Sequence, residues 1–248
     1  MECDNWDQHW RDCVEISDHY NPGVSYRRRI IRRLLQIQPD RPGYSLVELG
    51  SGTGQFANEF CSLFPLARFL GLDMSQEGVG CARKRVPAAR FEVCDLVQPV
   101  LDSEILRFAA THALCSEVLE HVDHPEMLLR NASSLMAPGC RLVVTVPGGP
   151  MTPFDKHIGH RRHYSPHELR SMLMAAGFEI ERVGGFGFPF YNLYRLGLLS
   201  RGAELVQMVS GPPSLLIRAG YYIFDTLCRF NLDQWGWQTV GIARWPGR

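Results

Sequence analysis

The histidines best placed for chemistry lie in one segment, DKHIGHRRHYSP, residues 155–166. His157, His160 and His163 recur at every third position, around the adjacent pair Arg161 and Arg162. An imidazole titrates near neutral pH, so it can take a proton from a substrate, and it is also a common metal ligand. The segment could therefore be a catalytic loop, a metal site or a nucleic-acid contact, or it could simply lead into a helix.

Two of these interpretations are disfavoured by the composition around the histidines. Asp155 is the only carboxylate of the segment, Gly159 works against a rigid helical presentation of the imidazoles, and two arginines are unfavourable beside a dication. The spacing also matches no zinc signature. Nucleic-acid binding is disfavoured because 26 basic residues balance 26 acidic ones, which leaves no overall positive field. The sequence therefore predicts no metal and no nucleic-acid partner.

A helix is predicted directly after the histidines, in SPHELRSMLMAAGF, residues 165–178. Ser165 and Glu168 have the spacing of a capping box, and Gly177 is a typical C-terminal stop. The histidines could therefore do no more than cap or pack against the start of this helix, together with Tyr164. Both the structural and the catalytic interpretation stay open.

A glycine-rich turn, ELGSGTGQ at residues 48–55, follows the apolar run YSLVELG. In an open α/β sheet, ligands bind where the parallel strands end, and this turn would lie there. The stretch GTGQFA also fits the dinucleotide pattern G-x-G-x-x-A. Glu48 separates the two interpretations, because a carboxylate there would repel a pyrophosphate but attract the ammonium and sulfonium groups of S-adenosylmethionine.

Two further acids end the next two predicted strands. Asp73 closes RFLGLD about 20 residues after the turn, where a carboxylate can accept hydrogen bonds from both ribose hydroxyls. Asp95 closes RFEVCD and could accept a hydrogen bond from the adenine amino group. Either acid alone could cap a helix or lie in solvent. With Glu48, they end three successive strands beside a glycine turn, which favours a shared cofactor site.

These residues would be positioned by strands that alternate with helices. A helix is predicted over residues 24–37, with Tyr26 among its apolar positions. The arginines of residues 27–33 read most simply as its solvated face, with an anionic substrate or a membrane surface as alternatives. The alternation predicts a doubly wound, mostly parallel α/β sheet covered on both faces. Its seven strands are expected at residues 44–50, 68–75, 90–96, within 111–122, and at 139–148, 178–186 and 237–245.

These motifs resemble those of class I S-adenosylmethionine-dependent methyltransferases, in the group that includes the ubiquinone and menaquinone biosynthesis enzymes. VELGSGTGQ is similar to their first motif, GLDMS and EVCDL to the ribose- and adenine-binding strands, and CSEVLEHVDHPEMLLR to the fourth-strand motif. The resemblance implies S-adenosylmethionine as the cofactor and a Rossmann-like sheet in the order 3-2-1-4-5-7-6 with the last strand antiparallel. The resemblance implies the following cofactor-binding residues, which include the three acids: Glu48, Gly50, Ser51, Gly52, Gly54, Asp73, Met74, Asp95, Leu96, Ser116 and Glu117.

Methyl transfer is an in-line displacement for which the enzyme mainly aligns the nucleophile and excludes water. An acceptor hydroxyl or amine must also lose a proton, and a histidine base contributes on the order of 10²- to 10⁴-fold to such a step. The histidine segment follows the fifth strand and would lie beside the methyl group. The candidate bases are, in order, His157, His160 and His163. The candidate substrate-binding residues are Tyr20, Tyr26, His121, Arg161 and Tyr164.

The chain is expected to form one methyltransferase domain with two additions. Residues 41–187 and 235–248 would form the cofactor-binding domain, and residues 1–40 a helical lid. Residues 188–234, rich in Leu, Tyr and Phe, would form a helical insertion between the sixth and seventh strands. This insertion could wall the acceptor pocket, form a homodimer interface or contact a membrane peripherally. Each role favours an apolar or aromatic acceptor.

The eight cysteines form no C-x-x-C pair, the N-terminus lacks the pattern of a signal peptide, and no stretch is apolar enough for a membrane span. These features predict a soluble cytoplasmic protein. The predicted function is metal-independent methyl transfer to a small-molecule acceptor, most simply O-methylation of a natural product, quinone or lipid-like precursor. A cofactor-binding scaffold without turnover and a nicotinamide-dependent dehydrogenase are the alternatives.

Overall fold

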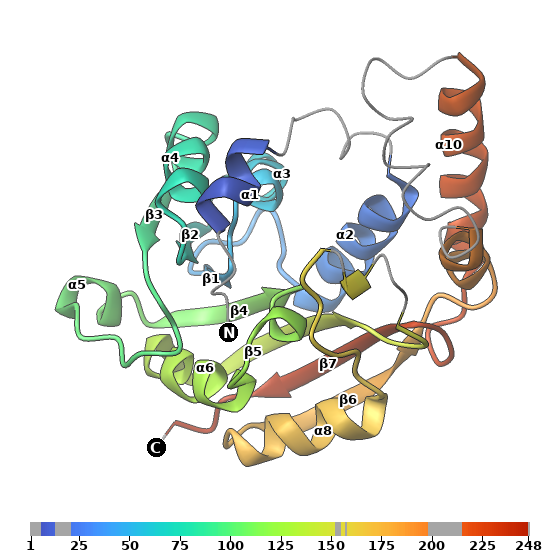
Figure 1. The fold of residues 1–248 in the computed structure, drawn as a ribbon. Helices are drawn as coiled ribbons and strands as arrows, with labels where there is room; N and C mark the ends of the chain where they lie inside the picture. The colour runs from blue at the N-terminus through green and yellow to red at the C-terminus, as the bar shows by residue number, and fades with distance from the viewer. Residues whose placement is uncertain (1–5, 13–20, 152–154, 157, 198–214, 248) are drawn as a thin grey trace.

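A seven-stranded sheet in the order β3-β2-β1-β4-β5-β7-β6 runs through the protein (Figure 1). The computed structural model describes residues 6–12, 21–151, 155–156, 158–197 and 215–247. The strands are β1 (Ser45–Leu49), β2 (Arg68–Asp73), β3 (Arg90–Val93), β4 (Ala110–Ser116), β5 (Met136–Pro147), β6 (Glu179–Phe186) and β7 (Gln238–Arg244).

The directions of the strands are those predicted from the motifs. β1 pairs in parallel with β2 and β4, β2 with β3, and β4 with β5. β7 runs antiparallel to both β5 and β6. Leu49 at the end of β1 pairs with Leu72 and with Cys115, so the chain leaves β1, β2 and β4 at the same edge of the sheet. The doubly wound α/β class is confirmed.

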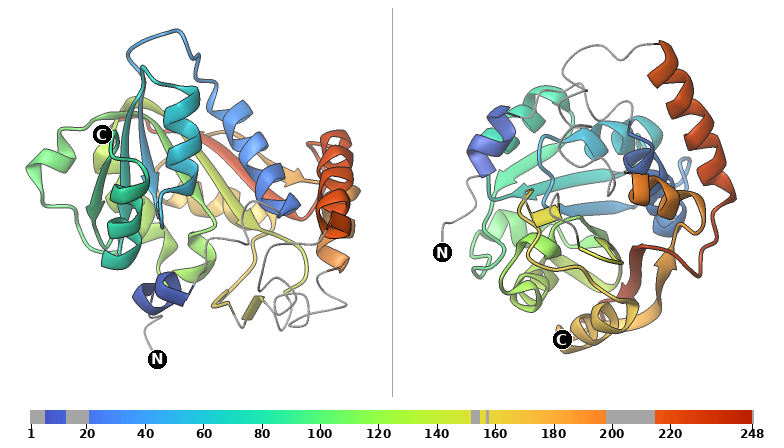
Figure 2. Two further views of the ribbon diagram at one scale, coloured as in Figure 1. Left: turned by 90° about the horizontal axis from the view of Figure 1, so that it is seen from above. Right: turned by 45° about the vertical axis from the view of Figure 1, so that its right-hand side comes forward.

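Helices cover both faces of the sheet (Figures 1 and 2). α2 (Pro22–Leu35), α3 (Gln55–Leu63) and α4 (Gln76–Arg85) share one hydrophobic core with one face. α5 (Ser103–Leu106), α6 (Pro125–Ala132) and α8 (Pro166–Ala175) share another core with the opposite face. Side chains alternate along β1, so Leu46 lies in the α2–α3 core whereas Val47 and Leu49 lie in the other. Glu48 therefore points to the side of α2 and α3.

Local signals explain where two of these helices begin and end. The Asn21 side chain accepts hydrogen bonds from the amides of Gly23 and Val24 at the start of α2, and Gln36 ends that helix in the left-handed conformation, with φ 57°. The helix is therefore shifted by two residues from its predicted range. α8 carries the predicted capping box of Ser165 and Glu168.

The segment between β4 and β5 departs from the predicted boundaries. The sequence favours a helix over residues 125–136, but α6 ends at Ala132 and a 3₁₀ turn, η3 (Ser133–Leu135), follows it. Met136 is already paired with Ala110, which is why β5 begins there. A second 3₁₀ turn, η2 (Leu119–His121), follows β4, because Glu117 adopts a left-handed φ of 57° and ends the strand.

The predicted insertion between β6 and β7 contains helices among its described residues. Residues 190–197 are helical, and α10 (Leu215–Leu227) continues into the 3₁₀ turn η4 (Cys228–Phe230). α10 is joined to α2 by Arg29, whose guanidinium donates to both carboxylate oxygens of Asp225 at 2.8 Å. At the N-terminus, α1 (Trp6–Asp12) lies against α4. Within the described parts of the chain, no helix combines the length and apolarity that a membrane span requires.

Candidate functional site

Two adjoining pockets open at the edge of the sheet where β1, β2 and β4 end. The first, about 290 Å³, extends along the ends of β2 and β3, and the second, about 360 Å³, lies between the glycine turn and α2. Both are lined by Trp6, Trp10, Gly50, Glu117 and His121. These shared walls join the pockets into one site, large enough for a cofactor and a small second molecule.

The turn after β1 is held in a conformation that favours glycine. Gly50, Gly52 and Gly54 have φ values of 78°, 50° and 75°, in the left-handed region. The amides of Gly50 and Ser51 donate to the carbonyl oxygen of Leu72 at 2.8 and 2.9 Å, so the turn is tied to β2. A side chain on Gly50 would place its Cβ 2.4 Å from Cγ2 of Val118.

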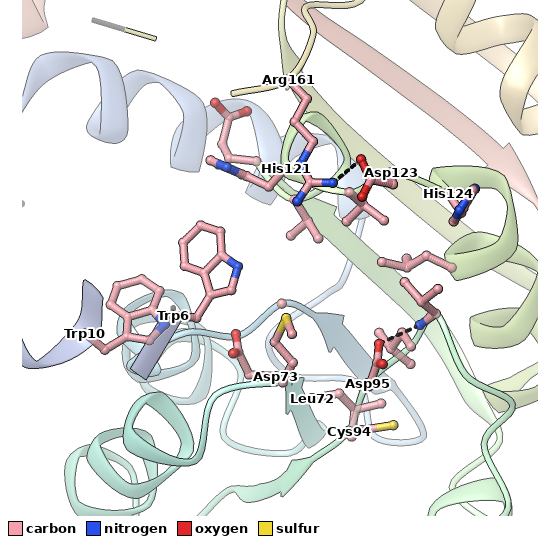
Figure 3. A pocket seen from close by; sticks show the side chains of 18 residues that line it. Trp6, Trp10, Leu72, Asp73, Cys94, Asp95, His121, Asp123, His124 and Arg161 are labelled. Atoms are coloured by element: carbon pink, nitrogen blue, oxygen red, sulfur yellow. Dashed lines mark hydrogen bonds and ion pairs between the residues drawn. The ribbon is translucent and has the colours of Figure 1, made fainter. Parts of the chain in front are cut away.

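Asp73 and Asp95 line the first pocket, as Figure 3 shows, opposite His121 and Asp123. Asp73 accepts hydrogen bonds from the amide of Gly52 at 2.7 Å and from the amide of Ser75 at 2.9 Å, so it also fixes the glycine turn. Burial raises the pKa of Asp73, and these two hydrogen bonds oppose the rise. Asp95 is exposed and accepts from an amide of its own turn. Met74 and Leu96 line the same pocket.

Glu48 lines the second pocket, beside the glycine turn. The residue is 5% exposed, and its Oε2 accepts no hydrogen bond from the described residues. Burial raises the pKa of Glu48 well above its usual range; the charge of Arg28 opposes this, and that of Asp73 adds to it. A buried carboxyl that lacks a full set of partners is suited to a cationic ligand.

Glu117, which lines both pockets, is held by residues from two distant parts of the chain. Its Oε2 lies 3.3 Å from Nη1 of Arg27 in α2, and its Oε1 accepts from Nε2 of Gln238 in β7 at 3.0 Å. Thr145 in β5 donates to the same Oε1 at 3.2 Å and is within hydrogen-bond distance of Ser116 Oγ, at 2.8 Å. Arg27 therefore lines the second pocket and binds Glu117, which corrects its interpretation as part of a solvated face.

The histidine segment forms a chain of hydrogen bonds. Nδ1 of His163 lies 3.1 Å from the carbonyl oxygen of Gly149, and Nε2 of His163 lies 3.2 Å from Nδ1 of His160. Burial lowers the pKa of His160 to about 4, and the charge of His121 adds to this. Burial also lowers the pKa of His163. The two imidazoles are therefore neutral at pH 7.

The candidate substrate-binding residues differ in their relation to the pockets. His121 lines both pockets, and its ring meets those of Trp6 and His160 edge to face, with centroids 4.9 and 4.8 Å apart. Arg161 lines the first pocket and forms an ion pair with Asp123 (Figure 3).

The other candidates lie away from the pocket walls or outside the described residues. Tyr26 and Tyr164 are buried in the two cores, and Tyr164 donates to the carbonyl oxygen of Leu119 at 3.1 Å. His160 and His163 stand behind His121 and are not among the pocket-lining residues. Tyr20 and His157 lie outside the described residues.

Three residues of the site were missed from the sequence. Trp6 and Trp10 of α1 line both pockets, and the Trp10 ring lies against the glycine turn at Gly52. Their spacing of four residues in WDQHW, within an otherwise polar stretch, is the signal that could have identified them. Glu120 is fully buried, and burial raises its pKa well above the usual range, with the charge of Glu117 adding to the rise. A second acid one helical turn after Glu117 was visible in EVLEH.

Comparisons with known proteins identify the family of the chain. The family model of the methyltransferase domain matches residues 18–183. Trans-aconitate 2-methyltransferase of Deinococcus radiodurans is 31% identical over 172 residues, which are 68% of this chain and 58% of that protein. Ubiquinone biosynthesis O-methyltransferase of Xanthomonas axonopodis pv. citri is 27% identical over 171 residues, 62% of this chain and 71% of that protein. The chain spans about half the length of most curated relatives that it matches.

A solved structure supports the fold. The N-methyltransferase NodS from Bradyrhizobium japonicum, in complex with S-adenosyl-L-homocysteine, superposes with a TM-score of 0.58 at 14% identity, and the match covers 98% of this chain and all of that one. At this identity the likeness concerns the fold alone. The family is given by the match over residues 18–183, which is more than half of the chain. The chain therefore belongs to the methyltransferase domain family.

Proposed function

We propose that this protein transfers the methyl group of S-adenosylmethionine to an oxygen of a small-molecule acceptor. The observation that supports this best is the set of acids around the glycine turn, because Glu48, Asp73 and Asp95 line two adjoining pockets. Glu48 would bind the ammonium group, Asp73 the ribose hydroxyls, and Asp95 the adenine amino group. The Glu48 carboxylate would repel the phosphate groups of a dinucleotide bound at the same place.

The junction of the two pockets is where the methyl group would be transferred. The acceptor oxygen would attack the methyl carbon as the bond from that carbon to sulfur breaks, which releases S-adenosylhomocysteine. The proton of the acceptor would pass to a neutral imidazole. Among the described histidines, His121 is the one that lines both pockets. Its ring packs edge to face against that of His160, which is within hydrogen-bond distance of His163.

The walls of the second pocket favour an acceptor with an apolar or aromatic body. Val24, Ile31, Phe56 and Ile158 line it together with the two tryptophans. A natural product, a quinone precursor or a lipid-like precursor would fit these walls, and the relative named as a ubiquinone biosynthesis O-methyltransferase supports this class. Residues 1–40 would act as a lid, residues 41–187 with 235–248 as the cofactor-binding domain, and residues 188–234 as a pocket wall or dimer interface. A cytoplasmic location, peripheral membrane contact and the absence of a metal from the reaction stay predictions.

The test combines cofactor binding with product formation. S-adenosylmethionine should raise the melting temperature, and S-adenosylhomocysteine should form when phenols, hydroxyquinones or hydroxylated lipids are added as acceptors. Cofactor binding without turnover over this panel and over cell extract would favour a non-catalytic scaffold instead. A melting temperature that rises with NAD and not with S-adenosylmethionine would replace the proposal with a dehydrogenase.

A further inference from the structure

Three potential metal ligands meet beside the two pockets, and one of them, His121, lines both. One ligand atom each from Glu120, His121 and His160 lies within 4.8 Å of the other two. Glu120 and His121 belong to η2, after β4, whereas His160 follows β5. The group is therefore assembled by the fold from two separate segments, and sequence spacing within the histidine segment could not show it.

Glu120 is the member of this group that most needs a partner. The residue is 0% exposed, and neither of its carboxylate oxygens has a hydrogen-bond partner among the residues that the structure describes. A buried carboxyl without side-chain hydrogen bonds is costly, and the charge of Arg27 has the smallest of the effects on the pKa of Glu120. Buried charges in proteins are generally paired or bound to metal. A cation between Glu120 and the two imidazoles would supply the missing partner.

The hydrogen bonds behind the imidazoles orient their lone pairs. A carbonyl oxygen can only accept, so the Nδ1 of a neutral His163 donates to Gly149, and its Nε2 accepts from Nδ1 of His160. This leaves the lone pair of His160 on Nε2. His121 likewise places Nδ1 3.2 Å from the carbonyl oxygen of Gly159, which puts its lone pair on Nε2. Metal-binding histidines are commonly held in this way through the other ring nitrogen.

Arg161 and Arg162, which disfavour a metal when the sequence is considered alone, both interact with Asp123. Arg161 forms an ion pair with the carboxylate of Asp123. Nη2 of Arg162 donates to the backbone oxygen of Asp123 at 3.4 Å. Their charges are therefore turned toward the loop that follows η2. The sequence argument considered Asp155 as the nearby carboxylate, whereas the fold also brings Glu120 close to His121 and His160.

A second group, Asp155 with His160 and His163, also brings three ligand atoms within 4.8 Å of one another. Asp155 is already paired with Arg195, whose two terminal nitrogens lie 3.2 Å from its two carboxylate oxygens. A dication there would face a guanidinium at close range, and His160 and His163 already share a hydrogen bond. This group is better suited to orient His160 than to bind the ion.

We propose that Glu120, His121 and His160 bind one divalent cation of the zinc, manganese or iron(II) type. Two imidazoles and one carboxylate suit these ions, and three protein ligands leave a coordination position open. Because His121 lines both pockets, the ion would lie at their wall and could polarise an acceptor oxygen. This role rests on the proposed function. His121 and His160 would then be metal ligands, and the ion, in place of a histidine base, would activate the acceptor oxygen. The site itself does not depend on that function.

The experiment measures cation binding by the full chain. Protein stripped with EDTA is titrated with Zn²⁺, Mn²⁺ and Co²⁺; bound ion is counted by elemental analysis, and Co²⁺ ligation is followed by visible absorption. One equivalent should bind and raise the melting temperature. Glu120→Gln and His160→Ala should lose this equivalent, and His167→Ala, an exposed histidine of α8, should retain it. His163→Ala, which removes the hydrogen bond that orients His160, should weaken binding about 10- to 100-fold.

Stoichiometric binding that persists unchanged in Glu120→Gln and His160→Ala would overturn the site. Wild-type protein that binds no equivalent, or X-ray absorption of bound zinc without imidazole ligands, would do so without relying on any variant to fold. Calorimetry with S-adenosylmethionine separates the two proposals. Cofactor binding without cation binding overturns the cation site alone, and cation binding without cofactor binding overturns the proposed function alone. Full methyl transfer by metal-free protein would overturn the role of the ion in the reaction.

Discussion

Replacing Glu48 by glutamine tests the cofactor assignment through a single charge. The pKa of the buried Glu48 carboxyl is raised well above its usual range, chiefly by desolvation. The carboxyl therefore tends to hold a proton in the cofactor-free protein and must release it when an ammonium group binds. Rising pH removes the competing proton, so the Kd for S-adenosylmethionine should fall as pH rises, by at most about tenfold per pH unit below the raised pKa.

The size of the effect follows from the burial of the pair that would form. Removing one partner of a buried, hydrogen-bonded charge pair costs about 2–5 kcal/mol. Part of the ion-pair energy in the wild type is used to remove the proton from Glu48, so the lower end of that range is expected. Glu48→Gln keeps the size of the side chain, and about 2 kcal/mol corresponds to a Kd roughly 30-fold higher. The dependence of Kd on pH should disappear with the carboxyl.

The assay is calorimetry at pH 6, 7 and 8, in pairs of buffers with different ionisation enthalpies. The wild type should release up to one proton on binding, and Glu48→Gln should release none. Glu104→Gln is the matched control, because Glu104 on α5 pairs with Arg107 at 3.0 Å and lines neither pocket. The reasoning is refuted if folded Glu48→Gln keeps both the wild-type affinity and the wild-type proton release.

Four further substitutions test the glycine turn, a helix and a buried histidine. Asp73→Ala should weaken cofactor binding in calorimetry and lower the unfolding free energy in urea by about 1–3 kcal/mol, because the buried amide of Gly52 loses its acceptor; unchanged affinity would refute the ribose assignment. Gly54→Ala should cost about 1–2 kcal/mol, because φ is 75° and the new Cβ would lie 2.9 Å from the nearest side-chain atom. At Gly80 in α4 a Cβ would meet nothing within 4 Å, so Gly80→Ala should instead stabilise the protein by up to about 1 kcal/mol. Melting temperatures of Gly54→Ala and Gly80→Ala that shift in the same direction would contradict this. Burial lowers the pKa of His112 from 6.5 to about 4. Between pH 6.5 and pH 4 the unfolded chain therefore binds one proton more than the folded protein, so His112 makes the protein less stable as the pH falls through this range. The difference in unfolding free energy between wild type and His112→Gln should thus change by about 3 kcal/mol from pH 7 to pH 4, and a constant difference would contradict the shift.

The parts of the fold that could be predicted from the sequence are those with a local cause. The capping box of Ser165 and Glu168 begins α8 whatever surrounds it. The glycine turn follows from three residues that can adopt a left-handed backbone. Asp73 could be placed at the edge of the sheet because parallel strands joined by crossover helices bring their carboxyl ends together. None of these inferences needs a contact between distant residues.

The parts that could not be predicted depend on contacts between distant residues. Arg27 is one of several arginines on α2, and only the fold shows that it meets Glu117. Gln238 reaches the same carboxylate from β7, which no motif marks. α1 could be recognised as aromatic, but its packing against the glycine turn through Trp10 depends on the tertiary structure. Helical periodicity alone assigns an arginine among arginines to solvent, because a charged side chain is usually exposed.

The two acids that follow β4, Glu117 and Glu120, differ in their interaction partners. Glu117 turns the backbone through a left-handed residue and is met by Arg27, Gln238 and Thr145. Glu120, three residues later, is fully buried and receives no hydrogen bond from the described residues, while the charge of Glu117 lies close enough to raise its pKa. Arg27 thus contributes one positive charge beside two buried or half-buried acids. A bound cation beside Glu120, or a sulfonium at the junction of the pockets, would offset the cost of burying the Glu120 carboxylate.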